Sequence, residues 1–302
     1  MPANFADVWL ARVRQNLTTQ NVAPWLDGIP ELDTNVLEMG SGDASELNVL
    51  HIPRTSFNPD VLINNTAYPL AIQAYTDDET VVSLDKFQTK ATSISDDKII
   101  GASYDVIDPA TKAHTVSINA KKFQKAAHAI APASNTANTP VIAATGTPRV
   151  SGGPASLVYD DLVNLKDALD AAEVPVEGRR LVLSTAHWND LLVDRKNFGD
   201  KLVNYNTGMP APVIAGFELY QYNGNPLYTS AGVKKAFGAV KDAGDRQGSF
   251  AFWIGQIAKK TGMTKQYFKE AKNDPEAQTN LINYRHYFIA MPFDSKAIGA
   301  IY

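Results

Sequence analysis

The chain has 302 residues, enough for two domains or one large domain with a substantial core. Apolar residues make up 44% and charged residues 20%, which argues against wholesale disorder, and the net charge of −4 argues against nucleic-acid binding through overall charge. The absence of cysteine excludes disulfides, thiolate metal sites and cysteine nucleophiles.

The first 46 residues predict an N-terminal arm rather than an independent core. Acidic Asp7 and the lack of an uninterrupted apolar run make the start of the chain unlike a secretory signal or a membrane span. Apolar residues around Trp9 fall at helical spacing, so this face packs either on its own domain or on a neighbouring subunit. The following stretch is rich in proline and glycine, with isolated apolar anchors such as Trp25.

Residues 47–84 contain two strand-like pieces, "LNVLHIPR" and "ETVVSL", separated by the long insert "TSFNPDVLINNTAYPLAIQAYTDD". Long connections in a compact domain are uncommon, and those that persist are usually functional or bound to something. A protruding two-stranded loop is marginal on its own and needs a partner surface. We therefore predict that this segment lies on a partner surface.

The clearest predicted helix spans residues 108–131. Asp108 suits its N-cap, Pro109 suits its first turn, and Pro132 ends it. Apolar residues step by three or four along it and predict one buried stripe: Ala113, Val116, Ala120, Phe123, Ala127 and Ile130. Three lysines lie off this stripe, at positions 121, 122 and 125, and we expect them on the solvated face.

A Thr-, Asn-, Gly- and Pro-rich stretch at 133–155 predicts a domain boundary. A second amphipathic helix follows it, and "RRLVL" at 179–183 then reads as a buried strand. In the next segment Ser184, His187 and Asp190 stand three residues apart, and these are the residue types of a hydrolase triad.

A capping role explains this segment better than catalysis. A nucleophilic serine at a strand-to-helix elbow needs small flanking residues, usually G-x-S-x-G, and "VLSTA" contains no glycine. Triads are also normally assembled from separate segments. We predict that Ser184 or Thr185 caps a helix whose Trp188 points to the core. We predict no catalytic residues, no metal ligands and no cofactor: the histidines and acidic pairs are too scattered for a metal site, and no phosphate-binding glycine loop appears.

The order of these signals carries a family resemblance. The segment "LVNLKDALDAAEVPVEGRRLVLSTAHWNDLLVD" resembles a stretch found in major capsid proteins of tailed phages with the Hong Kong 97-type fold. "PVIAGFELYQYNGNPLY", with Asn223-Gly224 as the expected hairpin turn, and the C-terminal "QTNLINYRHYFIAMPFDSKAIGAIY" are also similar to that family. Thr185 departs from the proline that many relatives carry. The resemblance covers residues 150–302 by motif and the rest by layout.

The resemblance implies an α+β chain with a Hong Kong 97-like capsid fold. Its expected parts are an N-terminal arm (1–46), an extended loop (47–84), a peripheral domain with a long spine helix (85–150), an axial domain (151–239) and the C-terminal part of the peripheral domain (240–302). The arm and the loop would then be buried on neighbouring subunits, with Trp9, Trp25, Arg54, Phe57 and Leu62 at the interfaces.

The resemblance implies a non-enzymatic shell protein of the virion. It would assemble in the host cytoplasm into hexamers and pentamers of an icosahedral capsid and enclose DNA without sequence-specific binding, with no membrane partner. Scaffolding, portal and decoration proteins are candidate partners, and because no assembly domain precedes the arm we expect a separate scaffold or an already processed chain. The alternatives are an encapsulin-type compartment, a serine hydrolase using Ser184 and His187, and an adhesin-like binding module.

Overall fold

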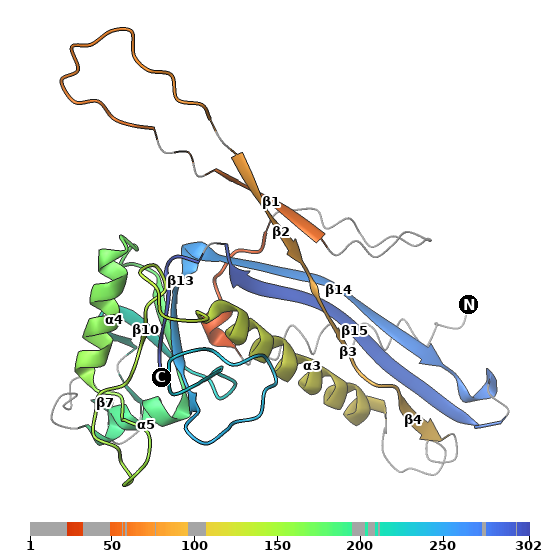
Figure 1. The fold of residues 1–302 in the computed structure, drawn as a ribbon. Coiled ribbons are helices and arrows are strands. Elements are labelled where there is room, and N and C mark those ends of the chain that lie inside the picture. The colour runs from red at the N-terminus through yellow and green to blue at the C-terminus, as the bar shows by residue number, and fades with distance from the viewer. Residues whose placement is uncertain are drawn as a thin grey trace.

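A computed structural model describes residues 23–32, 49–55, 57, 59–75, 77–95, 107–194, 203–204, 209–210, 212–273, 276–293 and 295–302. A compact part, an elongated part and a projecting loop make up these residues (Figure 1). The compact part surrounds a six-stranded sheet, and the elongated part consists of a long helix beside a long hairpin. None of the helices in the described ranges has both the length and the apolar composition to cross a membrane.

The six-stranded sheet lies at the centre of the compact part. Its order is β5 (Val141–Ile142), β16 (Ile298–Ile301), β13 (Ser249–Trp253), β6 (Arg179–Leu183), β10 (Phe217–Gln221) and β9 (Val213–Ile214). All five residues of β6 are buried, as expected for a strand covered on both faces. The helices α4 (Tyr159–Ala171) and α5 (Thr185–Val193) contribute to the core beside it through Leu162, Leu165 and Leu191.

The predicted boundary at residue 239 does not separate the strands of this sheet. Strands β13 and β16 come from the segment predicted to be peripheral, yet β13 pairs antiparallel with β6, and β16 pairs with β13. Strand β13 was not predicted, and the sequence did not indicate the partners of either strand, because pairing between segments distant in the chain leaves no local signature.

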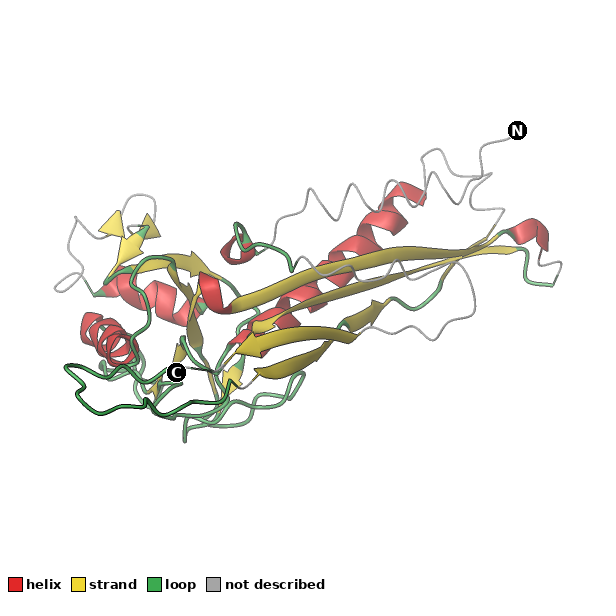
Figure 2. Ribbon diagram, turned by 90° about the horizontal axis from the view of Figure 1, so that it is seen from above, coloured by secondary structure: helices red, strands yellow, loops and turns green. Residues whose placement is uncertain are grey.

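The elongated part is built on the hairpin of β14 (Ile257–Lys269) and β15 (Thr279–Pro292), which pair antiparallel with an irregularity between Thr261 and Thr264. Strands β3 (Asp85–Gln88) and β4 (Thr92–Ser95) both pair with β15. The spine helix α3 (Ile107–Ile130) lies along this sheet (Figure 2). The predicted helix at 108–131 is therefore confirmed to within one residue at each end.

The buried face of α3 differs from the predicted stripe in its first half. Val116 is 52% exposed, and Ala113 and Ala120 are also exposed. The face toward the sheet is instead polar, and the buried residues there are Thr111, His114, Thr115, Ile118 and Asn119. His114 Nε2 lies 3.0 Å from Thr92 Oγ1, and Thr111 Oγ1 lies 3.5 Å from the hydroxyl of Tyr284. Hydrogen bonds of His114 and Thr111 with the strands thus accompany the apolar contacts of Ile118 with Ile282 and Tyr284.

In the second half of α3 the predicted stripe is correct. Phe123, Ala127 and Ile130 are buried in one cluster with Phe250, Phe252 and Phe288. The prediction that Lys122 lies on the solvated face is wrong, because this residue is only 6% exposed. Its ammonium lies 4.7 Å and 4.8 Å from the ring centroids of Phe123 and Phe288. Burial lowers the pKa of Lys122 to about 8, although Glu31 acts in the opposite direction.

The expected hairpin at Asn223-Gly224 is also not formed. The two residues make a turn, but β10 before it pairs with β6 and β9, whereas β11 (Leu227–Tyr228) after it pairs with β12 (Arg246–Gln247). Asn225 Nδ2 donates to the carbonyl of Val182 at 3.0 Å. This bond directs the chain across the end of β6 instead of back along β10.

The remaining elements are short. Strands β7 (Val203–Asn204) and β8 (Met209–Pro210) pair with each other. Three 3₁₀ turns lie at Pro24–Leu26, Ile254–Gln256 and Ala271–Asn273.

Candidate subunit interface

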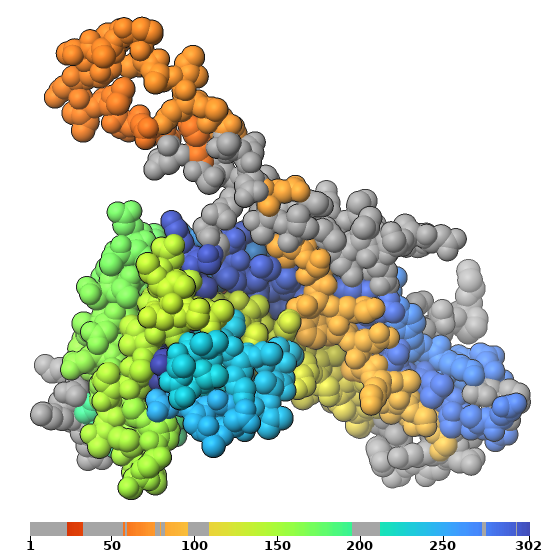
Figure 3. Space-filling model, in the orientation of Figure 1, coloured from red at the N-terminus to blue at the C-terminus, as the bar shows by residue number. Residues whose placement is uncertain are grey.

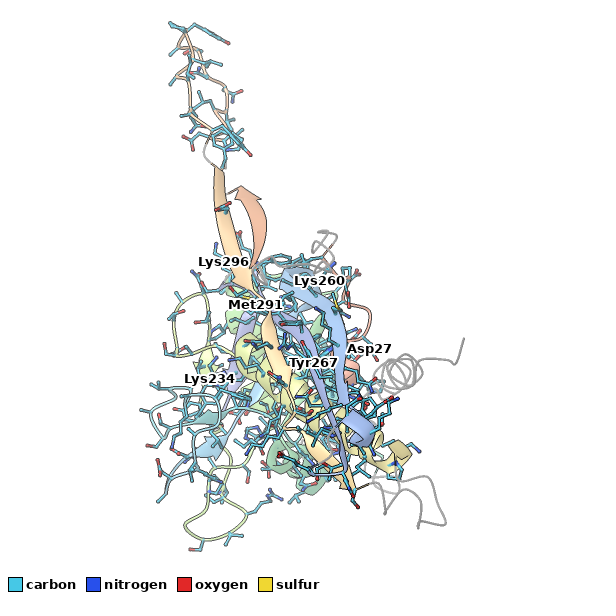
Figure 4. The ribbon with its side chains drawn as sticks, turned by 90° about the vertical axis from the view of Figure 1, so that its right-hand side faces the viewer. Asp27, Lys234, Lys260, Tyr267, Met291 and Lys296 are labelled. Atoms are coloured by element: carbon cyan, nitrogen blue, oxygen red, sulfur yellow. The ribbon has the colours of Figure 1, made fainter. Side chains whose placement is uncertain are left out.

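The extended loop projects from the body on a two-stranded stalk. Its strands β1 (Val49–Thr55) and β2 (Asp77–Ser83) pair antiparallel from Val49↔Ser83 to Thr55↔Asp77. Near the base of the stalk, Val82 and Leu84 are buried with Tyr287 and Ile289 of β15. In the side view the stalk rises above the part of the body that carries Lys260 and Met291 (Figure 4). The loop is therefore anchored at its base.

The loop tip, residues 57 and 59–75, is an apolar surface without a partner in the monomer. Its large apolar residues are strongly exposed: Val61 83%, Leu62 60%, Ile63 83%, Tyr68 78%, Leu70 55%, Ile72 98% and Tyr75 62%. The tip stands clear of the rest of the molecule (Figure 3). Single exposed apolar residues are ordinary, but a contiguous run of this kind marks an interaction site.

Polar contacts hold the tip together and leave its apolar side chains outside. The Asp60 amide donates to Gln73 Oε1 at 3.0 Å, and Gln73 Nε2 donates to Asp60 Oδ2 at 2.5 Å. The rings of Phe57 and Tyr75 meet edge to face, with centroids 5.5 Å apart. These non-covalent contacts hold the two sides of the loop together where the tip joins the stalk.

Apart from Trp25, the residues predicted to form the subunit interface lie in different parts of the extended loop or outside the described residues. Leu62 is exposed at the tip, and Phe57 is half-buried at its neck. Arg54 lies in β1, where its Cα pairs with that of Asp78. Trp9 lies outside the described residues. Tyr68, Leu70, Ile72 and Tyr75 were missed, although the alternation of the first three in "YPLAI" was a signal for a run with one apolar side.

The prediction for Trp25 is wrong, because this residue is fully buried in its own chain. Its ring packs against Tyr222, Phe250 and Phe252, with centroids 5.4 to 6.3 Å apart. Arg180 Nη1 donates to the carbonyl oxygens of Trp25 and Asp27, at 2.9 and 2.5 Å. Residues 23–32 thus form part of the core instead of reaching a neighbour.

Ser184, His187 and Asp190 do not converge on one another. Ser184 is the N-cap of α5, with its hydroxyl 3.4 Å from the His187 amide that it accepts from, which confirms the capping prediction. His187 Nδ1 lies 2.7 Å from Ser249 Oγ. Asp190 accepts from the Leu157 amide at 2.9 Å and pairs with Arg149 at 2.7 Å. Each side chain is buried and has a separate partner.

Burial sets the protonation of this trio. It lowers the pKa of His187 to about 4, with a smaller opposing effect of Asp161 and smaller additions from Arg149 and Arg246. It raises the pKa of Asp190, against the Leu157 hydrogen bond and Arg149. A buried neutral histidine bonded to Ser249 is a structural group. Within the described ranges, no group of three His, Asp or Glu residues could hold a metal ion.

Comparison with known proteins identifies the fold. A family model described as "Phage capsid protein" matches residues 77–301. The capsid of the cyanophage P-SCSP1u is 16% identical over 90% of this chain and 92% of that chain, with a TM-score of 0.63. The capsid of a native GTA particle is 11% identical over 91% and 95%, with a TM-score of 0.56. A virus-like particle from Pyrococcus furiosus is 8% identical over 99% and 100%, with a TM-score of 0.53. No curated protein matches the sequence.

These solved structures share the mixed helix and sheet architecture, which confirms the predicted Hong Kong 97-like α+β fold. The family match covers the second strand of the stalk, the spine helix and both strands of the long hairpin. With a protruding apolar loop and a match over most of its length, the chain belongs to the phage capsid protein family.

Proposed function

We propose that the chain is a shell subunit that assembles with copies of itself into hexamers and pentamers of an icosahedral capsid enclosing DNA. The observation that carries the proposal is the loop tip, which exposes a continuous apolar surface on a stalk anchored in the core. Complete burial of one aliphatic side chain contributes about 1.5–3 kcal/mol. Several such residues on every subunit, docked on a neighbour, supply cohesion that repeats over the whole shell.

The experiment replaces the loop tip, residues 57–75, by a short Gly-Ser turn. The melting temperature of the unassembled protein is expected to stay nearly unchanged, because the apolar side chains of the tip have little burial to lose. Closed shells should no longer form, as measured by sedimentation and electron microscopy. Unfolding of the monomer would show that the tip belongs to an internal core.

A point variant with a matched control sharpens this test. Ile63→Asp with Ile72→Asp places two charges on the tip. Val150→Asp with Val240→Asp places two charges on other strongly exposed apolar positions, 72% and 81% exposed. The first pair should block assembly and the second should not. Normal shells from the first pair would refute docking through the tip.

The same fold also supports a second candidate, a protein compartment without a genome. The virus-like particle from Pyrococcus furiosus matches this chain over its whole length, although at 8% identity. The contents of purified particles separate the two candidates. A capsid encloses DNA, whereas a compartment of this kind holds protein cargo.

We further propose that the chain has no catalytic role of its own. In support, the hydroxyl of Ser184 is buried at a helix cap, and the imidazole of His187 is bonded to Ser249. Assembly would take place in the host cytoplasm, with scaffolding, portal and decoration proteins as further partners. An active-site serine probe that labelled the purified protein would contradict the absence of catalysis.

A further inference from the structure

A groove of about 590 Å³ runs between the spine helix α3 and strands β3 and β4. Its rim carries Lys86 and Lys90 from the strand side and Lys121 from the helix side, all of them exposed. Gln88 and Ser117 add polar groups to the lining. All lining residues belong to the described part of the chain, and none of them is acidic. We call this feature the lysine groove.

The three lysines are available to a ligand. Among the described residues, neither Lys86 nor Lys90 has an ion pair, and Lys121 has one long contact of 3.5 Å to Gln124. Several lysines elsewhere are engaged: Lys235 pairs with Asp242 and Asp245 at 2.6 and 2.5 Å, and Lys260 donates to the carbonyl of Leu32 at 2.8 Å. The groove is distinguished by bringing three available lysines to one place.

Charge is distributed unevenly between the two parts of the molecule. Helix α3 carries one aspartate and four lysines, of which Lys122 is buried, and β14 carries four lysines and no acidic residue. Helix α4 of the compact part carries four aspartates and one lysine. The whole chain is nevertheless negative, at −4. A positive surface in an acidic protein favours a specific polyanionic partner over general attraction to anions.

We propose that the lysine groove binds the phosphate backbone of the enclosed DNA, so that the face formed by α3 and β3 lines the inside of the shell. The inference rests on the proposed capsid function, which supplies the DNA. Lysine ammonium groups bind phosphates as point charges, and hydroxyl and amide groups such as those of Ser117 and Gln88 are common additional phosphate contacts. The groove is open and offers no group arranged to read bases. It therefore suits sequence-independent contact.

The test measures binding of a 20-base-pair duplex to the unassembled full-length protein over a range of salt concentrations. The groove variant combines Lys86→Gln, Lys90→Gln and Lys121→Gln. The control combines Lys241→Gln, Lys272→Gln and Lys296→Gln, which removes the same charge from exposed positions outside the groove. Thermal melts of both proteins establish that they are folded.

Each phosphate contact contributes about 0.9 to the slope of log K against log salt. The groove variant should therefore reduce that slope by about 2 to 3 and weaken binding on the order of a hundredfold at 0.1 M salt. The control should leave the slope unchanged. Equal losses in the two variants, or none in either, would overturn the proposal.

Polyglutamate distinguishes an acidic protein from DNA as the occupant. If the groove variant loses polyglutamate binding and keeps its affinity for the duplex, the groove is a protein-docking site and the proposal is overturned. Loss of duplex binding with polyglutamate binding little changed supports it.

Sedimentation of assembly reactions separates this inference from the proposed function. If the wild-type protein forms no shells but binds DNA through the groove, the proposed shell function is wrong, whereas DNA binding by the groove is supported. If shells form and the groove variant binds DNA as the wild type does, the proposed DNA binding by the groove is wrong, whereas the shell function is supported.

An acylating reagent too large to enter closed shells tests whether the groove faces the inside of the shell. It should modify Lys86, Lys90 and Lys121 in free subunits and leave them unmodified in intact shells, and modification in intact shells would overturn the inward placement.

Discussion

His187 is expected to make the compact part of the molecule sensitive to acid. Burial lowers the pKa of His187 in the folded chain to about 4, from the ordinary 6.5. As the pH falls below 6.5, the unfolded chain therefore binds a proton that the folded chain does not bind until about pH 4. The free energy of unfolding decreases through this window, since protons favour the state that binds more of them.

The size of the effect follows from the two pKa values. Between pH 7 and pH 5, His187 alone should lower the free energy of unfolding by about 2 kcal/mol. Burial also lowers the pKa of His286, to about 3, so a second loss of similar size occurs in the elongated part. Carboxyl groups titrate over the same range. The contribution of His187 is therefore measured as a difference between two proteins.

The assay is urea unfolding of wild-type protein and His187→Gln at pH 7 and pH 5. At pH 7 the variant should be less stable by about 1–3 kcal/mol, because Ser249 loses one of its two buried partners and keeps the Ser184 amide. Between pH 7 and pH 5 the variant should lose about 2 kcal/mol less than the wild type. An equal loss in the two proteins would refute the reasoning, since it would show that His187 is accessible to protons in the folded chain.

Two further changes test the local structure. Phe123→Ala should lower the free energy of unfolding by about 3–5 kcal/mol, because the ring is 8% exposed and packs against Phe288. Val116 is 52% exposed, so Val116→Ala should change it by less than about 0.5 kcal/mol. Similar losses at both positions would contradict the observed buried face of α3. Ser184→Ala should cost about 0.5–2 kcal/mol through the lost cap, and Thr185→Ala should cost less, both measured by chemical denaturation. A larger loss of stability for Thr185→Ala than for Ser184→Ala would show that Thr185, not Ser184, is the N-cap of α5.

Local signals predicted the elements around β6 well. Five consecutive residues suited to a buried strand, followed by a serine and an apolar helical pattern, specify a strand, a cap and a helix without help from the rest of the chain. The spine helix was similarly visible from its proline boundaries and its length. The insert in the extended loop was recognisable because its apolar residues are too few to form a core of their own.

Tertiary contacts decided what could not be predicted. The stripe of alanines on α3 indicated a buried face, but Thr111 and His114 find hydrogen-bond partners on the strands and turn the polar face inward. Trp25 belongs to an irregular segment, and its tertiary contacts, among them the bonds from Arg180 to the backbone and the packing on Phe250, show that this segment folds onto its own chain. The lysine groove brings together residues from 86 to 121, a combination that no short motif records.

The order of strands in the six-stranded sheet has a consequence for how the protein is made. Strand β16 sits between β5 and β13, so residues 141–142 and 298–301 must meet across more than 150 residues of chain. Contacts so distant in sequence form slowly, because closing a long loop of chain costs conformational entropy before the contact stabilises it. During synthesis, strand β5 therefore has no partner in this sheet until β16, at the C-terminal end of the chain, has left the ribosome. The incompletely paired sheet should bind chaperones during synthesis, and the yield of folded chain should fall when chaperones are limiting.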